Sequence, residues 1–388
     1  MTPAARVQSA IELIDAIIAA ARDNGAAADT IIARWFAARR YAGSKDRAAV
    51  RDLVYRAIRA FGEPPQSGRA AFVGLAKHDA VLAAAFDGTG YGPPVIEPGE
   101  PAARPIAMPK WLGRQIDVAE HVALLERAPL DLRVNRLKTT REAMLAHWPH
   151  AEPIAALDGG LRLSASEAVE RSEPYLDGLV EVQDAGSQLV VAACRAAPGM
   201  TVVDLCAGGG GKTLALASAM GGAGRLVACD TDRNRLSRLV PRAAKAGADV
   251  TVRLLDPNRE DEALGDLIAQ ADVVLLDAPC TGTGTLRRNP EARWRLTPDR
   301  LARVMALQAH ILELGAPLVR PGGALVYAVC SLIEGEGAGQ VARFLTDNPL
   351  WRVEAPFEVG RAQGVGRMLT PAHDATDGFF VARLIAPC

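Results

Sequence analysis

The sequence predicts a multidomain protein whose C-terminal half is a doubly wound α/β domain. Its 388 residues exceed one ordinary hydrophobic core, so we expect two or three domains. In the C-terminal half, apolar strands alternate with helix-sized segments, a pattern typical of a parallel sheet with helices on both faces. The predicted strands are 201–205, 225–229, 250–255, 272–276 and 323–329.

Composition excludes several classes of protein. A hydrophobic fraction of 49% with 36 glycines indicates a packed globular chain. The first residues lack the pattern of a signal peptide, and no apolar run is long enough to cross a bilayer, so we expect a cytoplasmic protein with no membrane partner. The six cysteines include no C-x-x-C pair, which predicts free thiols and no metal site. The net charge of -1 leaves any polyanion site to local clusters.

The N-terminal region predicts a helical domain over 1–62, or as far as 86. Apolar residues recur at helical spacing within 10–21, and further helical blocks follow at about 29–39 and 41–59, the last with Ser44 as a cap. Basic residues outnumber acidic ones here, ten to six over the first sixty positions. This excess fits either a solvated face or an RNA-binding surface.

The middle of the chain predicts a connector and a small domain. Residues 87–109 are rich in proline and glycine and read as an extended linker, with a short helix expected near 70–86. Short helix and strand signals then alternate over 110–180, predicting a small α+β domain that positions RNA. Its basic segment Arg133-Val-Asn-Arg-Leu-Lys138 also fits an edge strand protected by charge. The catalytic domain is expected over 181–388.

A glycine-rich turn after the first of the C-terminal strands predicts a nucleotide-like ligand. It reads Asp204-Leu-Cys-Ala-Gly-Gly-Gly-Gly-Lys-Thr213, and its glycines let backbone amides approach a ligand closely. A P-loop is excluded because Cys206 stands where its first glycine belongs. The next two strands end in Asp230 and Asp256, which suit ribose hydroxyls and an adenine edge but are also common helix and turn caps. Together the three positions resemble an S-adenosylmethionine site.

Two thiols follow the last two predicted strands. The stretch Asp277-Ala-Pro-Cys280 begins a glycine-rich loop that ends in Arg287 and Arg288, and Cys330 ends the next strand. If these strands are adjacent, Cys280 and Cys330 face the same crevice. A lone cysteine is usually structural, but a pair beside Asp277 favours catalysis.

These motifs resemble the Fmu/Sun (RsmB-type) family of RNA cytosine-5 methyltransferases. The matching segments are Cys206–Thr213, Asp277–Gly284, Arg287–Pro290, Cys330-Ser331, Arg133–Lys138, Val182–Asp184 and Asp377–Phe380, while Gly43–Arg47 is similar to a NusB-like extension. The resemblance implies a Rossmann-like class I methyltransferase domain behind a NusB-like helical domain.

The resemblance also implies roles for single residues. Cys330 would be the nucleophile, Cys280 would assist product release, Asp277 would contact the cytosine edge and support proton transfer, and Lys212 would orient the catalytic loop. S-adenosylmethionine would be held by Cys206, Ala207, Gly208, Gly209, Gly210, Gly211, Lys212, Asp230, Arg235, Asp256 and Asp277.

The chain departs from the family pattern at three places. Gly208-Gly209 replaces alanine-proline, Val329 replaces the threonine before the nucleophile, and Glu336-Gly337-Ala338 replaces glutamate-asparagine-glutamate. None removes a reacting group, so the departures bear on cofactor affinity or rate.

A cluster of arginines beside the catalytic loop predicts RNA contact. Six lie between Thr285 and Met305, around a tryptophan that could stack on a base or belong to the core. The predicted RNA-binding residues are Arg133, Asn135, Lys138, Arg287, Arg288, Arg293 and Trp294.

We therefore expect a monomeric enzyme that methylates cytosine carbon 5 in RNA. The NusB-like region favours ribosomal RNA, and a base within a duplex would have to be extruded. A transfer-RNA methyltransferase and a catalytically weak RNA-binding assembly factor are the alternatives. The intact Cys280, Cys330 and Asp277 argue against a pure binding protein.

Overall fold

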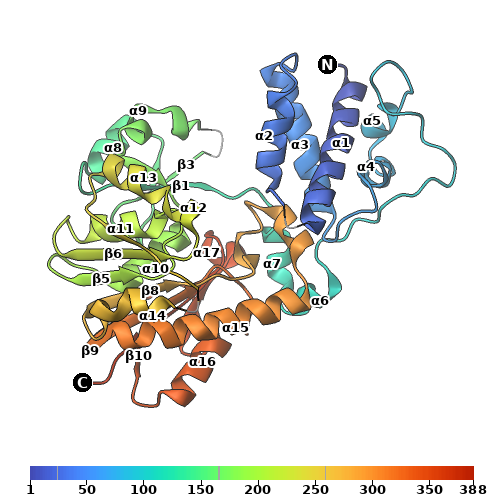
Figure 1. Ribbon diagram of the computed structural model, residues 1–388. Coiled ribbons are helices and arrows are strands. Elements are labelled where there is room, and N and C mark those ends of the chain that lie inside the picture. Colours follow the sequence, from blue (N-terminus) through green and yellow to red (C-terminus); the bar gives the residue numbers. More distant parts are fainter. Residues whose placement is uncertain (24, 165–166, 258) are drawn as a thin grey trace. The chain divides into compact units, whose positions relative to one another are not determined.

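The computed structural model describes residues 1–23, 25–164, 167–257 and 259–388 (Figure 1). The chain forms two compact units. One comprises Met1–Glu126 and Thr285–Pro298, and the other comprises Arg127–Gly284 and Asp299–Cys388. The boundary therefore falls later than the predicted end of the helical domain, and a short segment from the C-terminal half joins the first unit.

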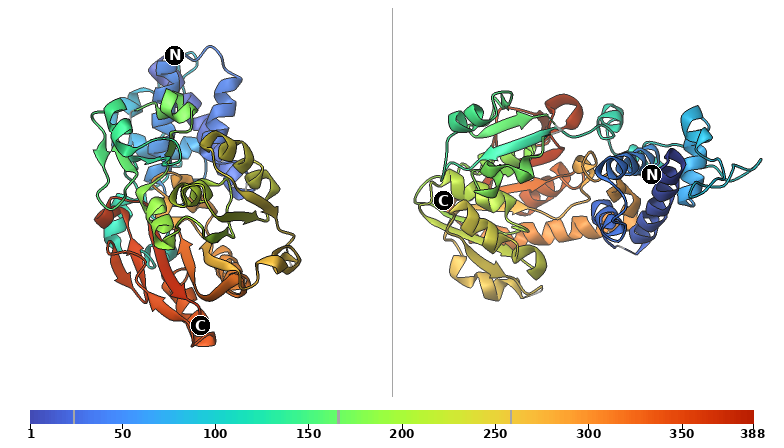
Figure 2. Two further views of the ribbon diagram at one scale, coloured as in Figure 1. Left: turned by 90° about the vertical axis from the view of Figure 1, so that its left-hand side faces the viewer. Right: turned by 90° about the horizontal axis from the view of Figure 1, so that it is seen from above.

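The first unit is helical, and its first three helices pack side by side (blue in Figures 1 and 2). Leu13, Ile14 and Ile17 of the first helix are fully buried, as the predicted apolar stripe requires. The third helix begins at Ser44 itself, with Gly43 at the N-cap position, so the predicted Ser44 cap is wrong. The helices are α1 (Pro3–Arg22), α2 (Ala28–Ala37), α3 (Ser44–Ala60), α4 (Gly68–Ala76), α5 (Ala80–Ala84), α6 (Lys110–Gly113) and α7 (Val118–Ala123).

The segment Thr285–Pro298 completes the core of this helical unit. Trp294 is 7% exposed, packs among the buried side chains of the helices, and donates from Nε1 to the Phe61 carbonyl at 2.7 Å. Arg293 is 1% exposed and donates to the carbonyls of Ile58 and Arg59 at the end of α3. The buried Glu291 accepts the Ala28 amide at 3.1 Å. This segment, which includes the 3₁₀ turn η4 (Pro290–Arg295), therefore belongs to the helical core.

The second unit is built on a mixed nine-stranded sheet with strand order β11-β12-β13-β9-β8-β5-β6-β7 and β10 paired to β13. The predicted strands are confirmed as the parallel run β9-β8-β5-β6-β7, whereas the antiparallel strands on the other side of β9 were not predicted. The strands are β5 (Thr201–Asp204), β6 (Arg225–Asp230), β7 (Thr251–Leu254), β8 (Ala271–Asp277), β9 (Val319–Val329), β10 (Arg352–Glu354), β11 (Arg361–Gln363), β12 (Gly366–Leu369) and β13 (Phe379–Ile385).

Helices cover this sheet, as the Rossmann-like prediction requires. Apolar side chains of α10 and α11 pack with β5, β8 and β9 in one cluster, and those of α12 and α13 pack in another. The helices are α10 (Ala185–Cys194), α11 (Gly211–Ala219), α12 (Arg233–Leu236), α13 (Leu239–Ala246), α14 (Glu260–Leu264), α15 (Pro298–Gly315), α16 (Ala338–Asp347) and α17 (Pro371–Asp374).

A small antiparallel sheet with strand order β2-β3-β1-β4 precedes the large one in the chain. Its strands are β1 (Leu130–Val134), β2 (Glu152–Pro153), β3 (Gly160–Leu163) and β4 (Val180–Val182), accompanied by helices α8 (Arg141–His147) and α9 (Glu173–Leu176). The expected mixed α+β region is therefore present, although α6 and α7 group with the helical unit.

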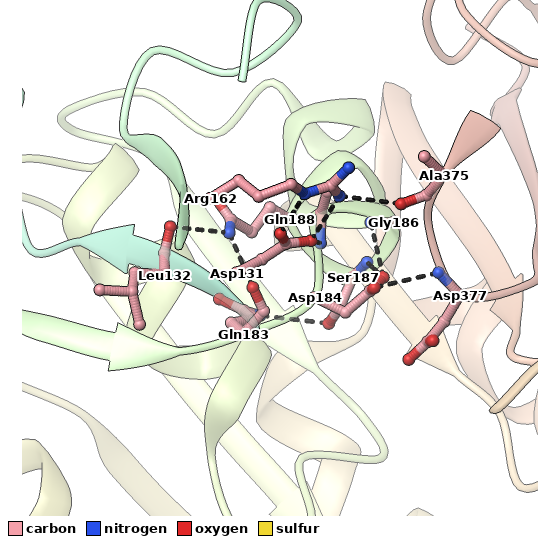
Figure 3. A network of polar contacts seen from close by, with 11 residues as sticks. Asp131, Leu132, Arg162, Gln183, Asp184, Gly186, Ser187, Gln188, Ala375 and Asp377 are labelled. Atoms are coloured by element: carbon pink, nitrogen blue, oxygen red, sulfur yellow. Dashed lines mark hydrogen bonds and ion pairs between the residues drawn. The ribbon is translucent and has the colours of Figure 1, made fainter. Parts of the chain in front are cut away.

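A polar network joins the small sheet to the large one (Figure 3). Arg162 donates to both oxygens of the buried Asp131, at 2.7 and 2.9 Å, and to the Ala375 carbonyl at 2.8 Å. Asp184 caps α10 through the Gly186 amide at 2.7 Å and accepts the Asp377 amide at 3.0 Å. The motif segments around 131–138, 182–184 and 377–380 are thereby held together.

Every helix among the described residues is too short or too polar to span a lipid bilayer.

Candidate active site

The loop between β5 and α11 has a backbone that only glycine adopts easily. Gly208 and Gly210 have φ values of 54° and 86°, in the left-handed region. The Gly208 amide donates to Oδ2 of Asp230 at 2.7 Å, and the Asp232 amide donates to Oδ1 at 2.8 Å. Asp230, at the end of the neighbouring strand β6, therefore fixes the shape of the glycine loop.

A cavity of ≈ 400 Å³ opens at this edge of the sheet. Its volume lies in the range of small-molecule sites. Cys206 of the glycine loop lines the cavity, as do the two thiols that follow β8 and β9. The lining residues are Leu205, Cys206, Asp230, Thr231, Asp232, Arg235, Leu255, Glu260, Asp277, Ala278, Pro279, Cys280, Leu307, His310, Ile311, Leu314 and Cys330.

The cavity contains part of the predicted cofactor set. Cys206, Asp230, Arg235 and Asp277 line it, while Ala207 to Gly210 form the turn before α11, and Gly211 and Lys212 begin that helix. Asp256 is exposed and does not line the cavity, whereas the preceding residue, Leu255, does. The predicted contact of Asp256 with an adenine edge therefore lacks support from its position.

One wall of the cavity was missed in the sequence. Leu307, Ile311 and Leu314 of α15 face it together with His310, which lies 3.6 Å from the Glu260 carboxylate. Their spacing of four and three residues is that of one helix face, so the apolar period could have found this wall. The sequence predicted RNA contact for this segment because of its arginines.

Lys212 and Asp277 form an ion pair beside the cavity. Lys212 Nζ donates to Asp277 Oδ2 at 2.7 Å, and the two side chains are 13% and 28% exposed. Burial alone would lower the pKa of Lys212, but the Asp277 carboxylate outweighs it and the pKa is raised. Lys212 therefore stays charged and holds one oxygen of Asp277 in place.

The two thiols meet as the adjacent strands predicted. β8 and β9 are parallel neighbours, with Asp277 paired to Ala328, so Cys280 and Cys330 follow at the same edge. Their sulfur atoms lie 3.2 Å apart. The hydrogen bond to Cys330, followed by burial, raises the pKa of the Cys280 thiol well above its usual value. The raised pKa favours the protonated thiol at Cys280.

A buried acid ends β5, the strand that leads into the glycine loop. Asp204 at the end of β5 is 0% exposed and accepts the Thr213 hydroxyl at 2.7 Å, while its Oδ1 has no hydrogen-bond partner among the residues that the structure describes. Burial raises the pKa of Asp204 to about 7, although the hydrogen bond from Thr213 lowers it. This carboxyl changes charge near neutral pH inside the fold.

The departures from the family pattern have local explanations. A Cβ on Gly337 would lie 2.6 Å from the Phe380 ring, so the ring takes the space that an asparagine would need. Val329 is fully buried and pairs with Phe380 across β9 and β13. A Cβ on Gly209 would make only an ordinary contact, 3.5 Å from Arg242. Glycine in place of proline at position 209 therefore leaves the backbone less restrained than in the family pattern.

Most of the predicted RNA-binding residues face inward. Arg133 is buried and bonded to Gln183 at 2.7 Å, and Asn135 is buried and donates to the carbonyls of Gly178 and Ala246. These two side chains anchor the small sheet, because a buried polar group requires a partner. Arg287, Arg293 and Trp294 are also buried, so the position of these five residues does not support direct RNA contact. Lys138 is exposed and Arg288 half-buried.

Comparisons with known proteins point to one family. A family model described as 16S rRNA methyltransferase RsmB/F matches residues 191–385. A probable ribosomal RNA small subunit methyltransferase B from Synechocystis is 38% identical over 267 residues, covering 66% of this chain and 59% of the relative. Ribosomal RNA small subunit methyltransferase B from Serratia proteamaculans is 37% identical over 288 residues, covering 71% and 66%. The chain thus spans about three fifths to two thirds of these relatives.

A solved structure shares the fold of the whole chain. The protein titled PH0851 aligns with a TM-score of 0.77 at 22% identity and covers 99% of both chains. At this identity the likeness concerns the fold alone. The predicted fold class is confirmed.

The residues around the cavity fit S-adenosylmethionine, and the family match confirms it as the cofactor. A glycine turn with a left-handed backbone, acidic side chains at the ends of β6 and β8, and an apolar helix face suit its amino acid, ribose and base. Within the described residues, no group of His, Cys, Asp and Glu side chains could hold a metal ion.

Proposed function

The chain belongs to the RsmB/F family of 16S rRNA methyltransferases, and from this premise we propose that it methylates carbon 5 of a cytosine in ribosomal RNA. The observation that carries the proposal is the pair of thiols, 3.2 Å apart at the edge of the cofactor cavity. Cytosine carbon 5 is a weak nucleophile, and a thiol that adds to carbon 6 overcomes this weakness.

In the proposed reaction, Cys330 is the nucleophile. Its thiolate forms a bond to carbon 6 of the base, and the displaced electron pair makes carbon 5 reactive. The chemistry that S-adenosylmethionine supplies when bound is an electrophilic methyl group on a sulfonium sulfur. After carbon 5 loses its proton to a base, the carbon–sulfur bond breaks and the Cys330 thiolate leaves, which restores the ring.

Cys280 assists that last step. Its raised pKa keeps a proton on the sulfur that faces Cys330, with the hydrogen bond to Cys330 as the largest cause. A hydrogen bond to the departing sulfur stabilises its developing negative charge. Cys280 therefore supports release of the product, not the attack.

Asp277 and Lys212 act on the base. Lys212 occupies Oδ2 of Asp277, and we propose that Oδ1 contacts the amino edge of cytosine and supports proton transfer at ring nitrogen 3. The fixed geometry of the ion pair favours this role, because a catalytic group must be held in register with the reacting ring.

We also propose that the helical unit binds RNA. Three arginines of this unit are exposed and can contact phosphates: Arg34 on α2, Arg40 between α2 and α3, and Arg51 on α3. The relatives named as ribosomal RNA small subunit methyltransferases support ribosomal RNA as the substrate in preference to transfer RNA.

The test is methyl transfer to ribosomal RNA that lacks this modification. The wild type should transfer labelled methyl groups from S-adenosylmethionine, and bisulfite sequencing should place them on cytosine carbon 5. Cys280→Ala should accumulate RNA bound covalently to the protein, whereas Cys330→Ala should form no adduct. Adducts with Cys330→Ala alone would exchange the two roles.

Absence of transfer to any RNA would overturn the enzymatic proposal. If RNA is bound but not methylated, the chain would be a binding protein that assists ribosome assembly. Transfer to unmodified transfer RNA but not to ribosomal RNA would replace the proposed substrate while leaving the chemistry intact.

A further inference from the structure

We infer that Glu336 positions the two thiols by joining the loop of Cys280 to the loop of Cys330. The catalytic consequence of this inference rests on the proposed function, whereas its structural content does not. Glu336 lies in the turn between β9 and α16 and is 0% exposed. It is not part of the cavity wall, so its action on the reaction would pass through other residues.

One carboxylate oxygen holds the Cys280 loop. Oε1 of Glu336 accepts the amide of Thr281, the residue after Cys280, at 2.8 Å. The same oxygen accepts Nε2 of the fully buried Gln308 at 3.0 Å, and Nε2 also donates to the carbonyl of Pro279, the residue before Cys280, at 2.9 Å. The backbone is therefore anchored on both sides of Cys280.

The other oxygen joins this loop to the second thiol. Oε2 accepts the hydroxyl of Thr281 and the hydroxyl of Ser331, the residue after Cys330. The Ser331 and Thr283 hydroxyls lie 3.0 Å apart, and Thr283 accepts the Leu332 amide at 2.9 Å. A single side chain thus contacts the immediate neighbour of each cysteine.

The two oxygens of Glu336 accept from four donors. Two of them are N–H groups, which cannot accept, and both point at Oε1. A buried carboxylate is costly unless it is fully hydrogen-bonded, and four donors offset that cost. After the bond to Cys330 and burial, the charge of Glu336 also helps to keep the proton on Cys280 by raising its pKa.

Bonds other than those of the carboxylate also hold the turn and the Cys330 loop. The Tyr327 hydroxyl donates to the Glu336 carbonyl at 2.6 Å, and Gly284 donates to the Cys330 carbonyl at 3.0 Å. Glu336 therefore cannot shift toward either loop without breaking bonds to the other. Its side chain sets the separation of the loops, and with it the distance between the sulfur atoms.

The distance between the thiols can be tested without RNA. Two neighbouring thiols condense with the trivalent arsenic of phenylarsine oxide, releasing water, whereas a single thiol binds it weakly. Cys280→Ala provides the blank, because it removes the pair. Glu334→Ala is the matched control, since Glu334 lies in the same turn with an exposed side chain.

We expect the wild type and Glu334→Ala to bind one equivalent of phenylarsine oxide in the presence of excess monothiol. Glu336→Ala should weaken this binding at least about tenfold, since small displacements of paired groups are costly. Glu336→Gln should restore it, because the amide oxygen can accept both N–H groups and the hydroxyls can rotate to accept from the amide nitrogen. If Glu336→Ala does not fold, Glu336→Asp is measured instead, since its side chain is shorter by about 1.5 Å.

The catalytic arm separates this inference from the proposed function. With unmodified ribosomal RNA, Glu336→Ala should lower kcat about 100-fold and leave KM for RNA and the affinity for S-adenosylmethionine nearly unchanged. Arsenical binding and kcat at wild-type levels in the Ala and Asp variants would overturn the role of Glu336. Loss of arsenical binding in a chain whose wild type methylates no RNA would overturn only the proposed function.

Discussion

Replacing Asp204 by asparagine should change the pH dependence of stability in the unit that contains the large sheet. Asp204 is fully buried, and burial raises its pKa from 3.8 to about 7. The side chains are nearly isosteric, and the asparagine oxygen can still accept from Thr213. The variant removes a carboxyl that must either take up a proton or carry a buried charge.

The magnitude follows from linkage. Because the folded-state pKa is raised, the folded protein binds the proton more tightly than the unfolded chain. The resulting stability is present below pH 3.8 and is lost as the pH rises toward 7. One pKa unit corresponds to 1.36 kcal/mol, so the full loss is roughly 4 kcal/mol, of which roughly 2 to 3 kcal/mol falls between pH 5 and 7.5. Asp204→Asn should escape this loss.

Amide hydrogen exchange in β5 provides the assay. Val202 and Val203 are buried and lie between β6 and β8, so their exchange reports opening of this unit alone. Comparison of variant and wild type at the same pH cancels the intrinsic rates. The protection ratio of Asp204→Asn to wild type should rise on the order of 50-fold from pH 5 to 7.5.

Asp272→Asn is the control for this experiment. Although burial raises the pKa of Asp272, its hydrogen bonds to Thr201 and Arg320 outweigh burial and lower it. Asp272 is therefore ionised at both pH values, and its protection ratio should stay constant. A constant ratio for Asp204→Asn as well would refute the assignment of a titrating buried acid behind the cofactor loop.

Three further predictions concern the cofactor loop, the ion pair and the helical core. Gly209→Ala should stabilise the protein by about 0.4–1 kcal/mol. Gly208 has a φ of 54°, so Gly208→Ala should destabilise the protein by about 1–3 kcal/mol and weaken S-adenosylmethionine binding. Calorimetry that ranks the two variants the other way would contradict the loop geometry. Lys212→Met should lower single-turnover methylation about 10- to 100-fold by releasing Asp277, with phenylarsine oxide binding retained; an unchanged rate would remove Lys212 from the reaction. Trp294→Ala should destabilise the helical unit by about 3–5 kcal/mol in thermal unfolding, and a loss of RNA affinity without loss of stability would restore its predicted contact with RNA.

The parallel core of the fold was predictable because its physical signal is local. Continuous apolar runs mark strands buried on both faces, and the acids and thiols at their ends fall at one edge of the sheet by topology alone. Cys280 and Cys330 could therefore be placed together from sequence. The antiparallel strands β10 and β11 escaped prediction because each has three residues and is largely exposed, and β12 is only four residues long. The buried strand β13 has a continuous apolar stretch that could have been predicted.

Side chains whose partners lie far away in sequence could not be assigned. Arg133 and Arg293 carry a charge that suggests RNA, but each is buried against groups 50 to 235 positions away. Glu336 stood out only as part of an altered motif, since its four donors come from three separate segments. Charge and spacing predict chemistry, whereas burial depends on the tertiary fold.

The segment Thr285–Pro298 has a consequence for how this protein can be divided or inherited. It is encoded within the catalytic half but forms part of the helical core, to which it contributes Trp294 and Arg293. No single cut in the chain separates the two units. A fragment that starts after Glu126 would display an apolar segment without its partners and should aggregate. Recombination that exchanged only the N-terminal helices would also separate this segment from its packing partners. The two units should therefore be inherited together.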